Sequence, residues 1–375
     1  MNNSNILSEP YQLGDLTLKN RIIMASVLRC RADPKDGILN DLHVQYYTQR
    51  ASAGLIMTEG IPVAKNGFSF PGASGLYNKE QVQGWKKVVE AVHAKGTPIF
   101  AQLWHAGRGA FPSVIGEQTI APSPIAIRGK PLIPTYEYGT PREMTKDDTK
   151  QVIEQFRQAA VNAKEAGFDG VELAATSGYL VDSFIRTSSN QRTDEYGGSA
   201  ENRARFCLEV IDAMISVFGA GRVGAKFTPV GRYQDMYDEN PLETFGYLLQ
   251  QLEKRGVAFV QLVEPDAPVP NAQPSERIAP EKQMAEVAKQ LRPYFKGTII
   301  INNGLTAESA EKAISSGVAD LASFGKDFIT NPDLVERIVN GWDINKNIDF
   351  STLLSGGEKG YTDYPIYSEV TTSSS

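Results

Sequence analysis

The chain has 375 residues and a formal net charge of −6, with 41% apolar and 22% charged residues. Charges of both signs are mixed, so neither nucleic acid nor an anionic membrane is indicated as a partner. No stretch approaches the roughly 18 uncharged apolar residues of a membrane helix. The first residues show neither a secretory signal nor a transit peptide, so we expect a cytoplasmic protein.

Metal and disulfide chemistry have little support in the composition. Cys30 and Cys207 are the two cysteines, without CxxC spacing, and we expect both to be reduced. Of the three histidines, His43 and His93 fall in segments that read as helices. A catalytic metal site would need more ligands of this kind, so none is expected.

The first predicted element is a β-hairpin at residues 11–20, where strand-like flanks surround Gly14 and Asp15. We expect this hairpin to plug the N-terminal mouth of a barrel. A second segment outside the main repeat, Gly107–Arg142, is rich in Pro and Gly and follows the third predicted strand. Long loops at such positions are usually functional.

Outside these two segments, short apolar runs alternate with amphipathic helical patterns, and no change of composition marks a linker. The runs predict eight strands, at Arg21–Ala25, Leu55–Glu59, Pro98–Leu103, Gly170–Leu173, Val223–Thr228, Phe259–Val263, Thr298–Ile301 and Leu321–Phe324. Helical patterns follow them, for example at Lys79–Lys95, Thr145–Ala166, Glu201–Phe218, Leu242–Lys254, Pro280–Leu291, Ala307–Ser316 and Pro332–Asn340. Runs rich in Val, Ile and Leu without polar alternation are typical of parallel strands buried on both faces.

Eight such units predict an α/β fold, a single (β/α)8 TIM barrel. A doubly wound sheet is the alternative, but it usually has five or six strands and a Gly-rich fingerprint after the first, and neither is seen. We expect one barrel domain over residues 1–367 and a disordered tail at 368–375.

In such barrels the active site lies at the carboxyl ends of the strands. Asn302–Gly304 and Phe324–Lys326 follow the last two strands, where barrels commonly hold a phosphate group, although these glycines could equally just turn the chain. Gln102–Arg108 places an amide, an indole and an imidazole after the third strand, which suits a flat aromatic ligand with polar edges. Trp104 as a packing residue and His105 as a structural histidine remain open.

At these residues the chain resembles the Old Yellow Enzyme family of flavin-dependent ene reductases, from about Leu13 to about Tyr367. The motifs that carry the resemblance are LKNRIIMA (18–25), YYTQRASAGLIMTEG (46–60), AQLWHAGR (101–108), IAPSPI (120–125), AGFDGVEL (166–173), NQRTDEYGGSAENRARF (190–206), LVEP (262–265), FGKDFITNPDL (324–334) and GYTDYP (360–365). Motifs this numerous and collinear are highly specific for the fold.

The resemblance implies that the barrel binds FMN, that NAD(P)H reduces it, and that hydride passes to the β-carbon of an activated alkene while Tyr179 protonates the α-carbon. The choice between NADH and NADPH stays open. By position, the flavin ring is expected at Ala25, Ser26, Val27, Leu28, Gly60, Gln102 and Lys226, its phosphate at Asn303, Gly304, Gly325 and Lys326, and the small-molecule substrate at Phe68, Trp104, Ala174 and Tyr233.

The sequence departs from the family pattern just before Tyr179. Family members usually carry a His–His or His–Asn pair that donates hydrogen bonds to the carbonyl or nitro oxygen of the substrate, whereas this chain has Ala174 and Ser177. Losing a donor to developing negative charge costs on the order of 10²–10³ in rate. An ordinary enone is therefore expected to be a poor substrate, with Ser177 or His105 as substitute donors.

Three departures concern the flavin. Leu28 stands where the family usually has a threonine near the flavin O4, and leucine cannot hydrogen-bond. Lys226 and Lys326 replace arginines at the pyrimidine edge and at the phosphate. Both lysines keep the positive charge but lose the planar bidentate fork.

Three functions remain open at this point. The first is an FMN-dependent ene reductase with a specialised substrate. The second is a non-redox isomerase or cyclase, in which an acid such as Tyr179 moves a proton. The third is a catalytically silent binding or scaffold protein. The sequence does not choose between a monomer and a homodimer.

Overall fold

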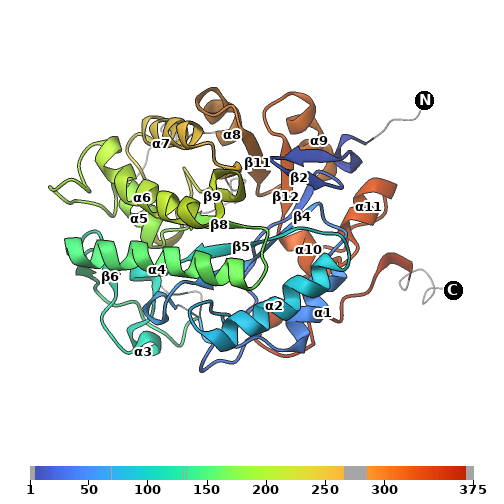
Figure 1. Ribbon diagram of the computed structural model, residues 1–375, viewed down its shortest axis with the longest axis horizontal. Coiled ribbons are helices and arrows are strands. Elements are labelled where there is room, and N and C mark those ends of the chain that lie inside the picture. The colour runs from blue at the N-terminus through green and yellow to red at the C-terminus, as the bar shows by residue number, and fades with distance from the viewer. Residues whose placement is uncertain are drawn as a thin grey trace.

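The computed structural model describes residues 5–68, 70–129, 131, 133–265, 284 and 286–368. Within them, eight parallel strands close into a barrel (Figure 1). They are β3 (Ile22–Met24), β4 (Leu55–Pro62), β5 (Ile99–Trp104), β8 (Gly170–Ala175), β9 (Val223–Phe227), β10 (Phe259–Val263), β11 (Thr298–Asn302) and β12 (Leu321–Phe324). The last strand pairs with the first, Ala322 beside Ile22. The predicted TIM barrel and its eight strands are confirmed.

Helices cover the outside of the barrel (Figure 1). They are α1 (Asp41–Gln49), α2 (Lys79–His93), α4 (Lys146–Glu165), α6 (Ala200–Phe218), α7 (Pro241–Arg255), α8 (Val287–Leu291), α9 (Ala307–Ser315) and α11 (Leu334–Asn340), with the shorter α3 (Pro112–Ile115), α5 (Leu180–Ile185) and α10 (Lys326–Thr330). In α2, Asn78 and Gln81 form a capping box, and the helix buries Val82, Trp85 and Val89. The predicted helices agree with α2, α4, α6, α7, α9 and α11 to within two residues. Most of the predicted N-terminal half of Pro280–Leu291 lies outside the described residues.

The N-terminal hairpin consists of β1 (Tyr11–Leu13) and β2 (Leu16–Leu18), which pair in antiparallel register. Gly14 has φ +59°, a left-handed conformation that glycine adopts without strain. Leu13 and Leu18 are fully buried and pack with Ile23 and Met57 inside the barrel. The expectation that the hairpin plugs the N-terminal mouth is confirmed.

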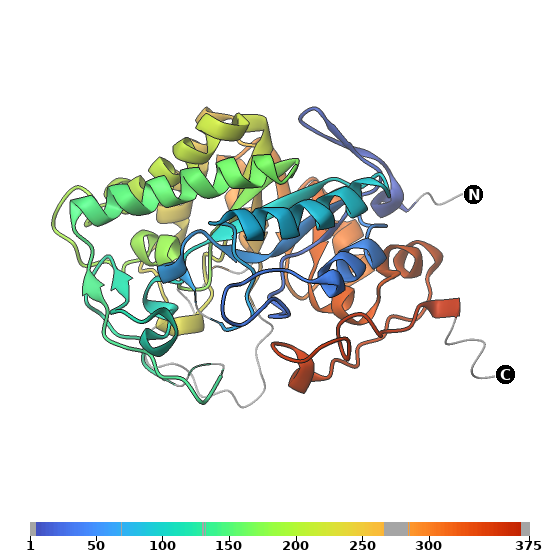
Figure 2. The ribbon, with the colours of Figure 1, turned by 60° about the horizontal axis from the view of Figure 1, so that its bottom comes forward.

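The opposite end of the barrel carries the long loop and the C-terminal segment. In Figure 2 the hairpin lies at the top, whereas the loop after β5 and the C-terminal segment lie at the bottom. Within the loop, β6 (Ile120–Ala121) pairs with β7 (Arg142–Glu143) at its end, in a two-residue parallel ladder. Phe111 stacks on Tyr136, with ring centroids 4.9 Å apart, and packs in one cluster with Trp104 and Ala174. The loop therefore covers part of the carboxyl-end face.

No described helix has the length and apolar character that crossing a membrane requires. Among the described residues, no group of three His, Cys, Asp or Glu side chains gathers as metal ligands would. Ser368 is the last described residue, so the expected disordered tail lies almost wholly outside the described part of the chain.

The buried hairpin leads to a prediction about stability. Replacing Leu18 with Ala should lower the free energy of unfolding by about 2 to 5 kcal/mol, because the cavity left behind the barrel plug cannot fully collapse. Urea unfolding monitored by circular dichroism measures the change. Thr17→Ala, at an exposed position of the same strand, is the control and should cost at most about 1 kcal/mol. Equal losses in both variants would contradict the plug.

Candidate active site

Two joined cavities open at the carboxyl ends of the strands. The first, of about 640 Å³, lies between the ends of β11, β12 and β3. The second, of about 400 Å³, lies over the ends of β4, β5, β8 and β9. Both are lined by Ser26, Asn302 and Asn303, so a single elongated ligand can extend from one into the other.

The first cavity has the features of a phosphate site. Asn303 and Gly304 turn the chain with φ +82° and +66°, and nothing lies within 4 Å of the place where a Gly304 side chain would begin. Lys326 lines the cavity as the first residue of α10, so its ammonium group and the first backbone N–H groups of that helix are available at the cavity. A cation beside several backbone donors fits a phosphate dianion.

The floor of the second cavity contains buried polar groups from three strands. The Gln102 amide donates to a carboxylate oxygen of Glu172 at 2.6 Å. Burial raises the pKa of Glu172 to about 7, although Lys226 and the Gln102 hydrogen bond oppose the rise. Burial also lowers the pKa of Lys226, and Glu172 opposes that shift. Gln102 and Lys226 line the cavity and together offer an amide and an ammonium group to a ring edge with polar atoms.

One wall of this cavity is aromatic. Trp104 meets Tyr179 edge to face, with ring centroids 4.4 Å apart at 77°. The indole Nε1 is buried and has no hydrogen-bond partner within the described part of the chain. A side chain at Gly60 would begin 3.2 Å from that nitrogen, so a larger residue would require the indole to shift by a few tenths of an ångström. Burial raises the pKa of Tyr179 well above 10, with smaller contributions from Tyr233 and Tyr138, so its phenol stays protonated at neutral pH.

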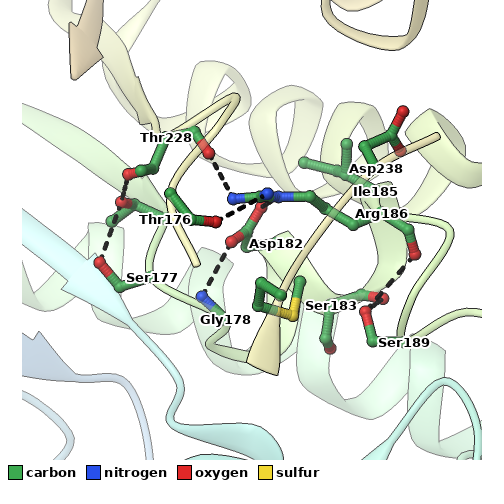
Figure 3. Close-up of polar contacts among 12 residues, drawn as sticks. Thr176, Ser177, Gly178, Asp182, Ser183, Ile185, Arg186, Ser189, Thr228 and Asp238 are labelled. Atoms are coloured by element: carbon green, nitrogen blue, oxygen red, sulfur yellow. Dashed lines mark hydrogen bonds and ion pairs between the residues drawn. The ribbon is translucent and has the colours of Figure 1, made fainter. Parts of the chain in front are cut away.

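Ala174 and Ser177 also line the second cavity. Ala174 is the next-to-last residue of β8 and is buried in the same cluster as Trp104. Ser177 has φ +60° in the turn that leads to Tyr179, and its hydroxyl lies 3.2 Å from that of Thr176, which in turn pairs with the hydroxyl of Thr228 (Figure 3). The wall just before Tyr179 therefore carries small aliphatic and hydroxyl groups.

A buried ion pair ties this wall to the next loop (Figure 3). Arg186 Nε lies 3.1 Å from Asp182 Oδ1, and both side chains are almost fully buried. Asp182 also accepts a hydrogen bond from the backbone N–H of Gly178 at 2.8 Å. Arg186 donates to the carbonyl groups of Gly231 and Thr228 in the loop after β9. One guanidinium thus holds the β8 and β9 loops together.

The loop after β9 is joined to the long loop by charge. Arg128 donates to both carboxylate oxygens of Asp235, at 2.8 and 3.0 Å. Gln234 and Asp235 both have positive φ, and Tyr233 just before them lines the second cavity while 43% exposed. This ion pair fastens the long loop beside the substrate side of the cavity.

The comparisons with known proteins agree with this geometry. The model of the NADH:flavin oxidoreductase / NADH oxidase family matches residues 6–345. This chain belongs to that family. It is an FMN-dependent oxidoreductase of the Old Yellow Enzyme type, as the sequence resemblance predicted.

Similar proteins of this flavin oxidoreductase family match over nearly the whole chain. The chain is 37% identical to 12-oxophytodienoate reductase 7 of Oryza sativa subsp. japonica, over 96% of this chain and 94% of the relative. It is 39% identical to a probable flavin mononucleotide-dependent alkene reductase of Leishmania infantum, over 96% and 97%. The solved Old Yellow Enzyme homologue from Zymomonas mobilis gives a TM-score of 0.90 at 36% identity, covering 96% of this chain and 99% of that one. Morphinone reductase gives 0.89 at 40%, covering 98% of both.

The residues of the flavin oxidoreductase fit FMN. The joined cavities place a cationic, glycine-lined site beside a slot with a polar floor and an aromatic wall. All eleven residues expected at the cofactor line one or both cavities: Ala25, Ser26, Val27, Leu28, Gly60, Gln102, Lys226, Asn303, Gly304, Gly325 and Lys326. Leu28 presents only an aliphatic surface there. The expected substrate residues Trp104, Ala174 and Tyr233 line the second cavity.

Two expectations about individual side chains need correction. Phe68 lines neither cavity, and its ring packs edge to face on Tyr77 in the cluster that supports Trp104. His105 is buried outside the cavity, where its Nδ1 accepts from the Gly107 N–H and its Nε2 meets Asn66 at 3.3 Å. Burial lowers the pKa of His105 to about 3, so it stays neutral. The prediction that His105 could serve as a substitute donor was wrong. Its position at a strand end did not determine the direction of its ring, which points away from the cavity.

Several cavity residues were missed by the sequence analysis. Thr176, Gly231, Arg232 and Val263 line the second cavity, and Thr306, Ser323, Lys346, Ile348, Phe350 and Leu353 line the first. Thr176 follows a strand directly, so the rule for strand ends could have found it. The sequence from Lys346 to Leu353 contains no motif that would place it at the site. It reaches the cavity through a contact between distant parts of the chain, in which buried Arg31 donates to the carbonyl of Thr352 at 2.6 Å.

The buried carboxyl group leads to a prediction about pH. Because the pKa of Glu172 is raised from its usual 4.5 to about 7, the folded protein retains a proton there that the unfolded chain has already released. The contribution of Glu172 to the stability of the flavin-free protein should therefore be complete below about pH 4.5 and be lost as the pH rises to about 7, by on the order of 3 kcal/mol. Glu172→Gln should flatten this slope in urea unfolding measured from pH 4.5 to 8. Glu80→Gln on the exposed face of α2 is the control, and an unchanged slope in Glu172→Gln would contradict the assignment.

Proposed function

We propose that this FMN-dependent oxidoreductase reduces the C=C bond of a small-molecule alkene with electrons from NAD(P)H. We also propose that hydroxyl groups of the protein bind the activating group of the alkene, in place of the His–His or His–Asn pair that the family usually has. The observation that carries the proposal is the protonated phenol of Tyr179 on the wall of the slot, above the polar floor formed by Gln102 and Lys226. Bound FMN supplies hydride transfer. Tyr179 supplies the proton that completes reduction.

Each remaining residue has a supporting role in this proposal. Lys326, with the backbone of Asn303, Gly304 and Gly325, holds the phosphate. Gln102 and Lys226 hold the pyrimidine edge of the ring, and Trp104 fixes the Tyr179 ring by its edge-to-face contact. Ser26, Ala25, Leu28 and Gly60 line the ring without crowding it.

The substrate side favours an alkene with an aromatic or bulky apolar part. Trp104, Tyr179 and Tyr233 line the cavity, and Phe111 and Tyr136 of the long loop pack in the apolar cluster that contains Trp104. Ala174 occupies little of the space that an imidazole would fill. A substrate with bulk next to its activating group can be accommodated there.

No observation in the site favours the isomerase or cyclase, and none of the relatives described above carries such a name. An absorption spectrum with NADH or NADPH distinguishes the three functions. Bleaching of bound flavin, with a product two mass units heavier than the alkene, supports the reductase. Conversion without bleaching supports the isomerase. No bound flavin and no turnover would support the silent binding protein. The cytoplasmic location stays a prediction. The choice between NADH and NADPH and the choice between a monomer and a homodimer stay open.

Replacing Tyr179 with Phe tests the proton donor. Turnover of the alkene should fall by about 10²-fold or more, because positioned general acids contribute roughly that factor. Reduction of the flavin by NAD(P)H in stopped flow should keep its rate, since that step needs no proton from this phenol. Tyr138→Phe, in the long loop, is the matched control and should retain most of the turnover. Unchanged turnover in Tyr179→Phe would show that another acid protonates the substrate.

Restoring the family pair tests the effect of its loss. The double variant Ala174→His with Ser177→Asn should raise the reduction of simple cyclic enones by one or more orders of magnitude, since donors of this kind contribute roughly 3 kcal/mol. The rate of enone-driven flavin reoxidation measures the gain. If the rate does not rise, then Leu28 or the shape of the cavity limits the reaction.

A further inference from the structure

Three hydroxyl groups on the wall of the second cavity form a continuous chain (Figure 3). Ser177 Oγ lies 3.2 Å from Thr176 Oγ1, and Thr176 Oγ1 pairs with Thr228 Oγ1. All three residues line the cavity. Thr176 and Ser177 follow β8, whereas Thr228 follows β9, so the chain spans two neighbouring strand ends.

The number of protons in this chain leaves one for a ligand. Three hydroxyl groups carry three protons, and the two contacts within the chain use two of them. In the described part of the structure, the three hydroxyls have no further hydrogen-bond partner. One O–H therefore remains for a ligand. When Thr228 donates to Thr176 and Thr176 donates to Ser177, that O–H is the one on Ser177, and the two internal hydrogen bonds strengthen it because linked hydroxyls polarise one another.

The backbone under the hydroxyl chain is fixed by the buried ion pair of Asp182 and Arg186. Asp182 accepts from the N–H of Gly178, directly after Ser177, and Arg186 donates to the carbonyl of Thr228. A side chain at Gly178 would begin 2.7 Å from Met236, so this turn also packs closely. Both ends of the chain are thus held before a substrate arrives.

We propose that Thr228 and Thr176 orient Ser177 so that its hydroxyl donates a hydrogen bond to the activating oxygen of the substrate. The proposal rests on the ene reductase function above and names what replaces the missing pair. The order of donation is Thr228 to Thr176 to Ser177 to the ligand, because Ser177 lies in the same turn as Tyr179. Ser177 is the donor, and the two threonines are positioning residues.

The single available proton also defines the substrate class. The chain offers one hydrogen bond, so it suits an aldehyde or ketone whose one oxygen accepts it. A nitroalkene brings two oxygens that share the negative charge, and one of them stays without this donor. We therefore expect α,β-unsaturated ketones or aldehydes with apolar bulk to be preferred over nitroalkenes of the same size.

The test uses the FMN-loaded enzyme, reduced with NAD(P)H and reoxidised by 2-cyclohexenone in stopped flow. Thr228→Val and Thr176→Val keep the side-chain shape without the hydroxyl, and each should slow reoxidation about 3- to 10-fold, the range expected for one hydrogen bond. Thr228→Ser and Thr176→Ser keep the hydroxyl and should restore most of the rate. Reoxidation by ferricyanide, which needs no hydrogen-bond donor, should be the same in all variants.

A second measurement separates orientation from a merely structural effect. If the hydroxyls act as one chain, Ser177→Ala combined with Thr228→Val should be no slower than Ser177→Ala alone, because the chain has already lost its donor. Independent, multiplying losses overturn the proposal. So does a slow Thr228→Val variant that Thr228→Ser does not rescue, or a Thr228→Val variant as fast as the unmodified enzyme.

The outcomes also separate this proposal from the proposed function. If the hydroxyl variants all react like the unmodified enzyme while Tyr179→Phe is slow, the hydroxyl chain is overturned and the ene reductase stands. If no unsaturated ketone, aldehyde or nitroalkene reoxidises the reduced enzyme, the ene reductase fails and the hydroxyl chain fails with it. Nitroalkenes that react faster than matched ketones would overturn the substrate class.

Discussion

Hydrogen bonding between the first and last barrel strands is the constraint on which the site depends. β12 pairs with β3, so residues about 300 positions apart in sequence lie side by side. Because all eight strands are parallel, their carboxyl ends meet at one rim. The N-terminal hairpin fills the other end with leucine side chains. A ligand can therefore enter at one end only, and there Ala25, Tyr179 and Lys326 come together from three distant segments.

Buried polar and charged side chains hold the loops at the rim. Charged side chains are rarely buried in proteins, because burial removes them from water. Arg186 and Asp182 are almost completely buried, and Gln102, Glu172 and Lys226 form a second polar group under the slot. Removing such groups from water is costly, and apolar residues often give equal stability. Apolar residues, however, cannot form the directed hydrogen bonds that fix two loops at a defined distance from each other. The polar groups thus contribute more to the geometry of the site than to the stability of the fold.

Much of the fold and part of the site could be predicted from the sequence. Parallel strands buried on both faces leave continuous apolar runs, and Gly14–Asp15 marks a hairpin, so these elements were found. Helices α5 and α10 are too short to show a helical period. Most residues expected at the strand ends line the two cavities, but the directions of individual rings depend on packing. Phe68 and His105 turned out to support the cavity from outside it, and the C-terminal segment at Phe350 depends on contacts with distant arginines.

The ion pair between Arg128 and Asp235 gives the long loop a different kind of attachment. Arg128 is more than half exposed, so water and dissolved ions reach this contact, unlike the buried pair beneath it. Screening at high ionic strength weakens such a surface pair. High salt therefore weakens this one attachment of the long loop, whereas the buried hydrogen bond from Arg108 to the Gln234 carbonyl is shielded from dissolved ions.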